Sequence, residues 1–286
     1  MASPSPSSST IPAVVVTGAD GQLGQTLKAL WAQSPLRESY QLVGLNKASV
    51  DITDSEQLSQ RLNRLEVAAL INGAAYTAVD AAETQREQAF AVNEHGAANL
   101  ATWAAWSGCR FIHLSTDFVF DGRQTRPYLP DDDPAPLGVY GASKLAGERA
   151  VLARCPQALL LRTSWLYSPY RKNFVRTMLG LMSQRDSLKV VNDQIGSPTA
   201  SHTLAQVLLA MVATEAPGGI YHWTDGGALS WYDFAVAIQA EALDLGLLSR
   251  AIPIAPIPTS EYPTPAKRPP YSVLDTDTTR AHFDCP

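Results

Sequence analysis

A glycine-rich turn near the N-terminus, set between an apolar run and a helical segment, constrains the fold of this chain most strongly. Residues 13–16, an alanine and three valines, are typical of a parallel strand that is buried on both faces. Residues 17–24 carry three glycines, and residues 25–33 favour a helix. A buried strand that passes through such a turn into a helix predicts an α/β fold with a parallel sheet.

The glycines follow the spacing G-x-x-G-x-x-G rather than the G-x-G-x-x-G of the usual dinucleotide fingerprint. We expect Gly18 to allow the tight turn, Gly21 to let the backbone approach a pyrophosphate, and Gly24 to let the helix pack close to the sheet. The helix N-terminus adds unpaired N–H groups and the positive end of a dipole. The turn therefore predicts a dinucleotide site; the alternative is a glycine turn that binds no nucleotide. The residues expected to contact the cofactor here are Gly18, Asp20, Gly21, Gln22, Leu23 and Gly24.

A second strand, residues 40–45, leads to the segment that distinguishes the two nicotinamide cofactors. Sites that prefer NAD usually have an acidic residue about 20 residues beyond the glycines, for the ribose 2′-hydroxyl. This chain has Asn46 and Lys47 there, and a cation suits a 2′-phosphate. We therefore expect NADPH, with NADH still possible, and the other interpretation is a solvent-exposed lysine. Asp51 and Ile52 are expected to line an adenine pocket.

The third strand, residues 67–71, ends in small residues that would let a cofactor lie against the backbone. Ligands of open α/β sheets bind outside the carboxyl ends of the strands, and this is such an end. Asn93, within a helix expected over residues 88–107, is a cofactor candidate that can also serve as an interior polar link. The candidates directly after the strand are Gly73, Ala74, Ala75 and Tyr76.

The fourth strand, residues 109–114, ends near a hydroxyl that can point at a substrate carbonyl. Thr116 is the candidate, with Ser115 as the alternative. His113 lies inside the strand and is expected to be a core histidine rather than a catalytic base.

A tyrosine and a lysine four residues apart, Tyr140 and Lys144, precede an apolar helical run over residues 145–152. In a helix the two side chains lie on one face, a turn apart. A phenol has an ordinary pKa of about 10, and a neighbouring ammonium favours the phenolate and lowers that pKa. The pair therefore predicts a general acid and base poised nearer the working pH. The alternative is an amphipathic surface helix.

Composition excludes several classes of function. A net charge of -5 leaves no basic surface for nucleic acid, and no apolar run is long enough to span a bilayer. The three cysteines, Cys109, Cys155 and Cys285, lack metal-ligand spacing and are expected to be reduced thiols of a cytoplasmic protein. Residues 1–11, rich in serine and proline, predict a disordered tail and do not have the pattern of a secretory signal.

Seven ordered motifs give the chain a resemblance to the dTDP-4-dehydrorhamnose reductase family of extended short-chain dehydrogenase/reductases. The resemblance covers about residues 13–283 and implies a Rossmann-type doubly wound parallel sheet with a smaller C-terminal α/β substrate-binding domain. We expect residues 12–164 to form the dinucleotide-binding domain, residues 187–214 to return to it, and residues 165–286 to form most of the substrate domain. The motifs are residues 17–24, 72–83, 114–122, 139–144 with 147–148, 161–167, 193–199, and 268–269 with 272–275.

The resemblance implies that Thr116, Tyr140 and Lys144 are the catalytic triad of a reductase that acts on the C4 keto group of dTDP-4-dehydro-6-deoxy-L-mannose. Tyr140 would donate the proton, Lys144 would lower the pKa of that phenol and hold the nicotinamide ribose, and Thr116 would polarise the carbonyl. Arg268 would pair with the diphosphate of the nucleotide-sugar, and the alternative for this residue is a solvated basic turn. The substrate contacts are expected to be Thr116, Asp117, Phe118, Trp165 and Arg268.

Three departures from the family pattern accompany this resemblance. Phe118 stands where the family commonly has tyrosine, and Tyr271 where it often has asparagine. Asp20 replaces a frequent asparagine and is expected to cap local amides. Some members are described with Mg²⁺ at a dimer contact, but no carboxylate cluster here matches it, so we predict no metal and leave a homodimer open.

Two other functions stay open at this point. A reductase or epimerase of another nucleotide-sugar would carry the same triad. A non-catalytic subunit similar to the regulatory β subunit of methionine adenosyltransferase would retain it by inheritance.

Overall fold

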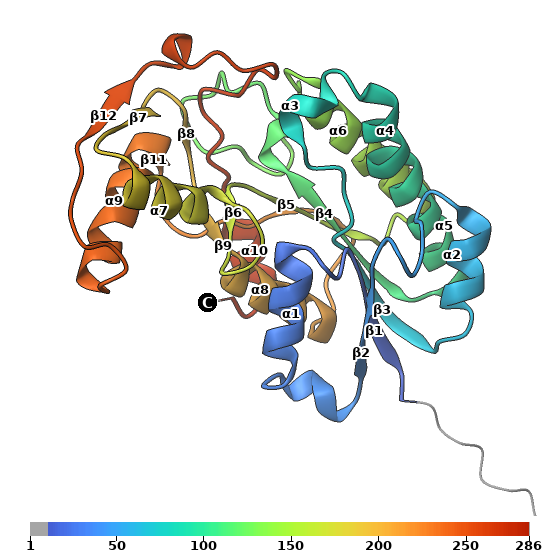
Figure 1. Ribbon diagram of the computed structural model, residues 1–286. Coiled ribbons are helices and arrows are strands. Elements are labelled where there is room, and N and C mark those ends of the chain that lie inside the picture. The colour runs from blue at the N-terminus through green and yellow to red at the C-terminus, as the bar shows by residue number, and fades with distance from the viewer. Residues whose placement is uncertain (1–10, 286) are drawn as a thin grey trace, which may run out of the picture.

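A parallel sheet of six strands forms the centre of the computed structural model, which describes residues 11–285. Its order is β2-β1-β3-β4-β5-β10 (Figure 1). The sheet grows outward in both directions from β1 and β3, so the loops that leave these two strands diverge and open a crevice at their carboxyl ends. The strands are β1 (Ala13–Thr17), β2 (Gln41–Leu45), β3 (Val67–Asn72), β4 (Arg110–Thr116), β5 (Leu159–Thr163) and β10 (Gly219–His222).

Helices cover both faces of this sheet (Figure 1). The valines of β1 explain the arrangement, because alternate side chains of a strand point to opposite faces. Val14 and Val16 belong to the core cluster that holds α1 (Gln22–Trp31) and α8 (Ser201–Ala213). Val15 belongs to the cluster on the other face, under α2 (Ser55–Leu62), α5 (Ala97–Ser107) and α6 (Val139–Arg154). The predicted burial of this strand on both faces is confirmed.

The segment before α5 departs from a regular helix. The helix expected over residues 88–107 contains a π-helical stretch, Ala91–Gly96, between α4 (Arg86–Phe90) and α5. A methyl group added at Gly147 of α6 would lie 2.0 Å from the carbonyl oxygen of Asn93. The absence of a side chain at Gly147 therefore lets α6 lie directly against this stretch. The short α3 (Val79–Ala82) precedes α4.

A smaller unit from the C-terminal half packs α7 (Phe174–Gln184) against α9 (Trp231–Asp244), around a core that includes Met178, Phe234 and Ile238. Ser230 caps α9 with a reciprocal pair of hydrogen bonds to Asp233. The paired strands around this core are β7 (Leu188–Val191) with β12 (Ile254–Ile257), β8 (Ile195–Gly196) with β11 (Leu229–Ser230), and β6 (Leu166–Tyr167) with β9 (Thr199–Ala200). The remaining elements are α10 (Asp277–His282) and the 3₁₀ turns Pro35–Glu38, Asp117–Val119 and Thr259–Glu261.

The two units interleave along the chain. Of the segment expected to return to the large unit, residues 187–214, α8 packs on α1 while β7 pairs within the small unit. β10 then supplies the sixth strand of the large sheet. The tail expected over residues 1–11 lies outside the described residues, apart from Ile11. Within residues 11–285, no helix combines the length and apolar character needed to cross a membrane.

Candidate active site

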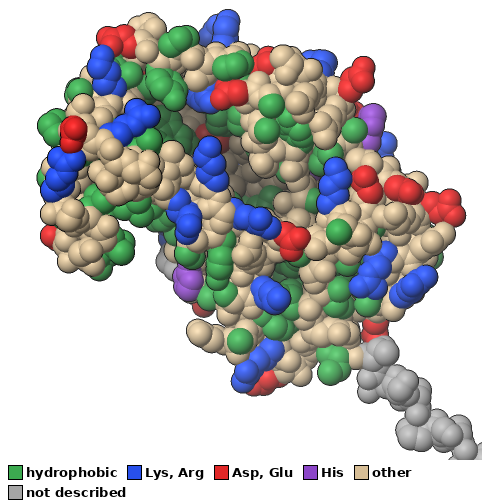
Figure 2. All heavy atoms as spheres, in the orientation of Figure 1, with side chains coloured by type: hydrophobic (Ala, Val, Ile, Leu, Met, Phe, Trp, Pro, Cys, Tyr) green, Lys and Arg blue, Asp and Glu red, His purple; other side chains and the backbone are tan. Residues whose placement is uncertain are grey.

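A cleft of about 1110 Å³ lies at the carboxyl ends of the sheet strands, between the two units. The glycine turn lines it on one side, α6 carries Tyr140 and Lys144 to another, and the small unit supplies Trp165 and Arg171. Figure 2 shows it as a hollow with Lys and Arg side chains along its rim. All of the predicted site residues except Asn93 and Arg268 therefore line this one cavity.

The glycine turn is held closed by backbone packing. Gly18 has φ +70°, and a methyl group there would lie 2.6 Å from the carbonyl oxygen of Gly73 in the loop after β3. A methyl group at Gly24 would lie 2.6 Å from the Cα of Ala19, so the close approach that requires this glycine is to the turn itself rather than to the sheet. Among residues 11–285, no side chain caps α1, which begins after Gly21. A helix N-terminus of this kind offers the amides of its first turn as donors to an anion.

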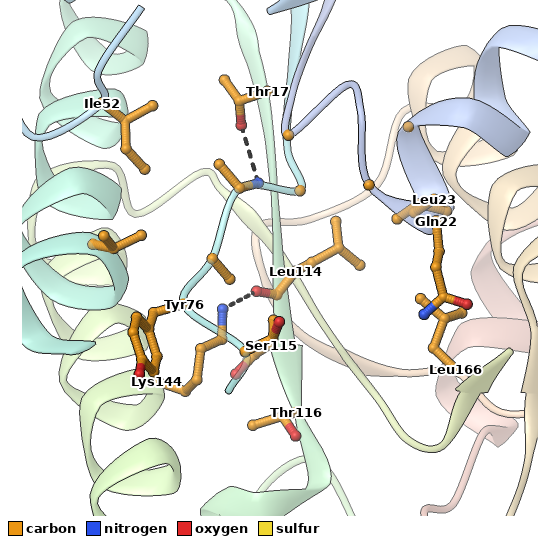
Figure 3. A pocket seen from close by; sticks show the side chains of 18 of the residues that line it. Thr17, Gln22, Leu23, Ile52, Tyr76, Leu114, Ser115, Thr116, Lys144 and Leu166 are labelled. Atoms are coloured by element: carbon orange, nitrogen blue, oxygen red, sulfur yellow. Dashed lines mark hydrogen bonds between the residues drawn. The ribbon is translucent and has the colours of Figure 1, made fainter. Parts of the chain in front are cut away.

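A series of hydrogen bonds links the start of the glycine turn to β3 and β4. The Thr17 hydroxyl donates to Asn72 Oδ1 (2.7 Å) and accepts from the backbone N–H of Ala74 (3.3 Å; Figure 3). The Asn72 amide nitrogen lies 2.9 Å from Nδ1 of His113. Burial lowers the pKa of His113 well below its usual value, with the Lys144 charge adding to the effect. His113 is the core residue that was expected, and Thr17 and Asn72 are supporting residues that the sequence did not single out.

In the part of the cleft expected to hold the adenosine of the cofactor, Asp20 has a different partner from the predicted one. The Asp20 carboxylate accepts a hydrogen bond from the side-chain amide of Asn46 (2.9 Å) instead of capping local backbone amides. Asp51 accepts from the backbone and hydroxyl groups of Thr53, which lower its pKa, and the charge of Lys47 contributes. Lys47, Asp51 and Ile52 all line the cleft.

Gly73, Ala74, Ala75 and Tyr76 line the cleft, whereas Asn93 does not. The Asn93 side chain is buried and bonds both backbone polar groups of Tyr76 (2.8 and 3.1 Å) and the hydroxyl of Ser143 (2.9 Å). Asn93 therefore ties the loop after β3 to α6. Of its two expected roles, the structure gives it the interior link.

The three triad candidates meet at the end of β4. Thr116 is the last residue of that strand, and its hydroxyl donates to the adjacent Asp117 (3.0 Å). A methyl group at Gly141 would lie 2.1 Å from the carbonyl oxygen of Phe118, so the first turn of α6 presses against the backbone just after Thr116. The ring of Phe118 meets that of Tyr140 edge to face, with centroids 5.6 Å apart.

Lys144 points to the strand rather than toward a carboxylate. Its Nζ donates to the carbonyl oxygen of Leu114 at 2.6 Å (Figure 3). Burial lowers the pKa of Lys144 to about 8, and the charge of Glu148 opposes the shift. Burial also raises the pKa of Tyr140 to about 12; the charge of Asp117 adds to the rise and a hydrogen bond from Thr116 opposes it. The expectation of a lowered tyrosine pKa is wrong, because desolvation of the phenol dominates.

Asp117 is the buried carboxyl group of the site, with 2% of its surface exposed. Burial raises its pKa to about 6, and hydrogen bonds from Ser272 and Thr116 oppose the shift. Its position beside Thr116 and Tyr140 lets its ionisation act on both hydroxyl groups.

Two substrate candidates from the second half have different surroundings. Trp165 lines the cleft with φ +45° and stacks on Trp231, with ring centroids 3.5 Å apart. Arg268 does not line the cleft: it forms a two-point ion pair with Asp80, at 2.9 and 3.1 Å. In this structure Arg268 is paired with Asp80 of α3, and its expected pairing with a substrate diphosphate stays a prediction.

Arg171 and Lys172 line the cleft and were not predicted. Both belong to a loop that contacts the glycine turn, although the loop and the turn are about 150 residues apart in sequence. No local sequence pattern indicates such a contact. In the described part of the chain, His, Cys, Asp and Glu side chains do not gather in groups of three or more that suit a metal ion.

Comparisons with known proteins agree with this geometry. Residues 12–286 match the family described as the RmlD substrate binding domain. The dTDP-4-dehydrorhamnose reductase of Aggregatibacter actinomycetemcomitans is 41% identical, covering 92% of this chain and 90% of that protein. The enzyme of the same name from Burkholderia thailandensis is 39% identical, covering 94% and 92%. A crystal structure of dTDP-4-dehydrorhamnose reductase from Bacillus anthracis in complex with NADP has a TM-score of 0.88 and 36% identity, covering 95% and 93%. The chain belongs to the dTDP-4-dehydrorhamnose reductase family.

Proposed function

We propose that this protein reduces the C4 keto group of dTDP-4-dehydro-6-deoxy-L-mannose to give dTDP-L-rhamnose, with NADPH as the reductant. The observation that carries the proposal is the meeting of Thr116, Tyr140 and Lys144 in the same cleft as the glycine turn. Relatives named for this reaction, at 41% and 39% identity, support the choice of sugar. The relative crystallised with NADP supports the choice of cofactor.

The residues of the cleft fit a dinucleotide. Gly18 and Gly24 leave no room for side chains, and the uncapped first turn of α1 offers its amides to a diphosphate. Lys47 lies on the cleft wall, where its charge suits a 2′-phosphate. When bound, NADPH supplies the hydride that reduces C4.

The chain itself supplies the proton. Tyr140 donates it to the C4 oxygen, and its raised pKa keeps the phenol protonated throughout the neutral range before reaction. Thr116 donates a hydrogen bond to the same oxygen, where negative charge develops. Lys144 holds the ribose hydroxyls next to the nicotinamide, and its ammonium stabilises the phenolate left on Tyr140. Asp117, Phe118 and Trp165 hold the sugar.

The test is the oxidation of NADPH in the presence of dTDP-4-dehydrorhamnose, with other nucleotide-linked keto-sugars assayed in parallel. Tyr140→Phe should lower kcat by about 10²- to 10⁴-fold, the usual contribution of a general acid, while its affinity for NADPH stays within error. Tyr262→Phe is the matched control, because Tyr262 is exposed and outside the cleft.

Three results would contradict parts of the proposal. Equal activity of Tyr140→Phe and the parent would remove Tyr140 as the acid. Faster turnover of another keto-sugar would identify that sugar, rather than dTDP-4-dehydrorhamnose, as the substrate. Lack of NADPH oxidation with every sugar tested, by a protein that still binds NADPH, would favour a non-catalytic subunit.

A further inference from the structure

A loop of the C-terminal half, residues 168–173, lies directly on the glycine turn. The side-chain oxygen of Gln22, the first residue of α1, accepts hydrogen bonds from the hydroxyl of Ser168 (2.8 Å) and the amide of Asn173 (3.0 Å). The Nε of Arg171 donates to the backbone carbonyl of Asp20 (2.8 Å). Three contacts therefore fix this loop at the start of α1, and Figure 3 shows Gln22 and Leu166 on the same side of the cleft.

Arg171 keeps most of its hydrogen-bonding capacity. A guanidinium has five N–H groups, and the bond to Asp20 uses only the one on Nε. Among residues 11–285, the two terminal nitrogens of Arg171 have no hydrogen-bond partner, and the residue lines the cleft together with Lys172. Two cations, Arg171 and Lys172, thus line the same cleft as the glycine turn.

Arg176 supports this arrangement from α7. Its guanidinium donates to the carbonyl oxygen of Pro169 (2.6 Å), at the other end of the loop. Asn173 caps α7 by accepting from the backbone N–H of Arg176 (3.1 Å). The loop is therefore held by contacts to both the small unit and the large one, and these contacts position Arg171.

We propose that Arg171, assisted by Lys172, binds the diphosphate of the nicotinamide cofactor and so makes the C-terminal half part of the cofactor site. The position argues for the cofactor rather than the nucleotide-sugar. Asp20 immediately precedes Gly21, after which the first turn of α1 offers its amides to phosphate. A planar guanidinium matches the oxygens of a diphosphate in a two-point contact. This inference rests on the proposed function only in taking the cofactor to be a dinucleotide.

The experiment measures binding alone, by isothermal titration of the full-length protein with NADP⁺, 2′-AMP and dTDP. Arg171→Gln should raise the Kd for NADP⁺ about ten-fold, the loss expected for a hydrogen bond to a charged group. The Kd for 2′-AMP should not change, because that ligand has the 2′-phosphate but no diphosphate. The Kd for dTDP should not change either. Because no sugar is reduced, failure of the proposed reaction would not affect this result.

Two further variants control for structure and for general charge. Lys172→Gln keeps the Arg171 contact to Asp20 and should give a smaller rise in the Kd for NADP⁺. Lys28→Gln removes a cation from the far end of α1 and should change none of the three affinities. Unchanged NADP⁺ binding in both Arg171→Gln and Lys172→Gln would overturn the proposal. Weaker dTDP binding with unchanged NADP⁺ binding would overturn it as well, since it would assign the cations to the nucleotide-sugar.

Discussion

Arg162 of β5 and Glu148 of α6 form a two-point ion pair in the interior, at 2.9 and 2.7 Å, with 2% of each side chain exposed. The guanidinium also approaches the carbonyl oxygen of Pro130 (3.3 Å) and lies 5.0 Å from the ring centre of Phe120. Glu148 is one helical turn beyond Lys144. The pair thus connects the sheet, the loop before α6 and the helix that carries Tyr140 and Lys144.

Glu148→Gln should destabilise the protein by about 3–5 kcal/mol, because it leaves the buried Arg162 without its counter-charge. Urea unfolding followed by circular dichroism measures this change. Replacing both partners, as Glu148→Gln with Arg162→Met, should be less destabilising than Glu148→Gln alone. The control is Arg250→Gln, at an exposed pair with Asp186, which should leave the midpoint unchanged. Equal effects of Glu148→Gln and Arg250→Gln would show that the interior pair has no special role.

Gly141→Ala should displace the first turn of α6, because the added methyl group would lie 2.1 Å from the backbone oxygen of Phe118. We expect kcat to fall about ten-fold or more through misplacement of Tyr140, and stability to fall by about 1–3 kcal/mol. Steady-state kinetics and thermal unfolding measure the two effects. Gly180→Ala in α7 is the matched control: in the described part of the chain its methyl group would have no neighbour within 4 Å, so stability should rise by about 0.5–1 kcal/mol. A kcat unchanged by Gly141→Ala would mean that α6 can shift without cost.

The pKa of Lys144 makes a prediction about stability at alkaline pH. Burial lowers this pKa from 10.5 to about 8, so the folded protein binds the proton less tightly than the unfolded chain does. Below pH 8 both states are protonated, and the cost of burying the ammonium is present in full. Between about pH 8 and 10.5 the folded protein has released the proton and the unfolded chain has not, so the unfolding free energy rises with pH.

Lys144→Met should lack this contribution. The measurement is urea unfolding of the ligand-free parent and variant at a series of pH values, because other groups titrate in the same range and only the difference isolates Lys144. The unfolding free energy of the parent should increase relative to that of the variant as pH rises from 8 to 10.5. Parallel curves for the two proteins would mean that the Lys144 pKa is not lowered.

Lys47→Ala should lower kcat/KM with NADPH about ten-fold and leave kcat/KM with NADH nearly unchanged, because only NADPH has a 2′-phosphate to pair with the ammonium. Asn46, which bonds Asp20, stays intact in this variant. Lys28→Ala on the exposed end of α1 should alter neither value. An equal loss with both cofactors would assign Lys47 a role in shaping the loop rather than in binding phosphate.

Features that depend on neighbours in sequence were predictable. The strand, the glycine turn and the start of α1 follow one another within a few residues, and Gly18 does adopt the left-handed conformation that the turn requires. The resemblance to the family, carried by seven short motifs, is confirmed by the family match and by the relatives.

Features that depend on distant partners were not predictable. The pKa of Tyr140 follows from its burial in the folded cleft, a tertiary effect that the i, i+4 spacing with Lys144 does not contain. Arg268 pairs with Asp80, 188 positions earlier, and a basic residue before two prolines gives no sign of that partner. The contact of Arg171 with Asp20 spans 151 positions and escaped prediction for the same reason.

The place of β10 in the sheet has a consequence for how the chain folds while the ribosome synthesises it. β5 pairs with β4 on one side and with β10 on the other, and β10 comes only at residues 219–222. Until the ribosome has delivered that segment, the nascent chain presents an unpaired strand edge that carries Leu159, Leu160 and Leu161, which are buried in the finished protein. Such an edge is a template for pairing with other chains. A truncation at residue 164 should therefore give an aggregating fragment rather than an isolated cofactor-binding domain.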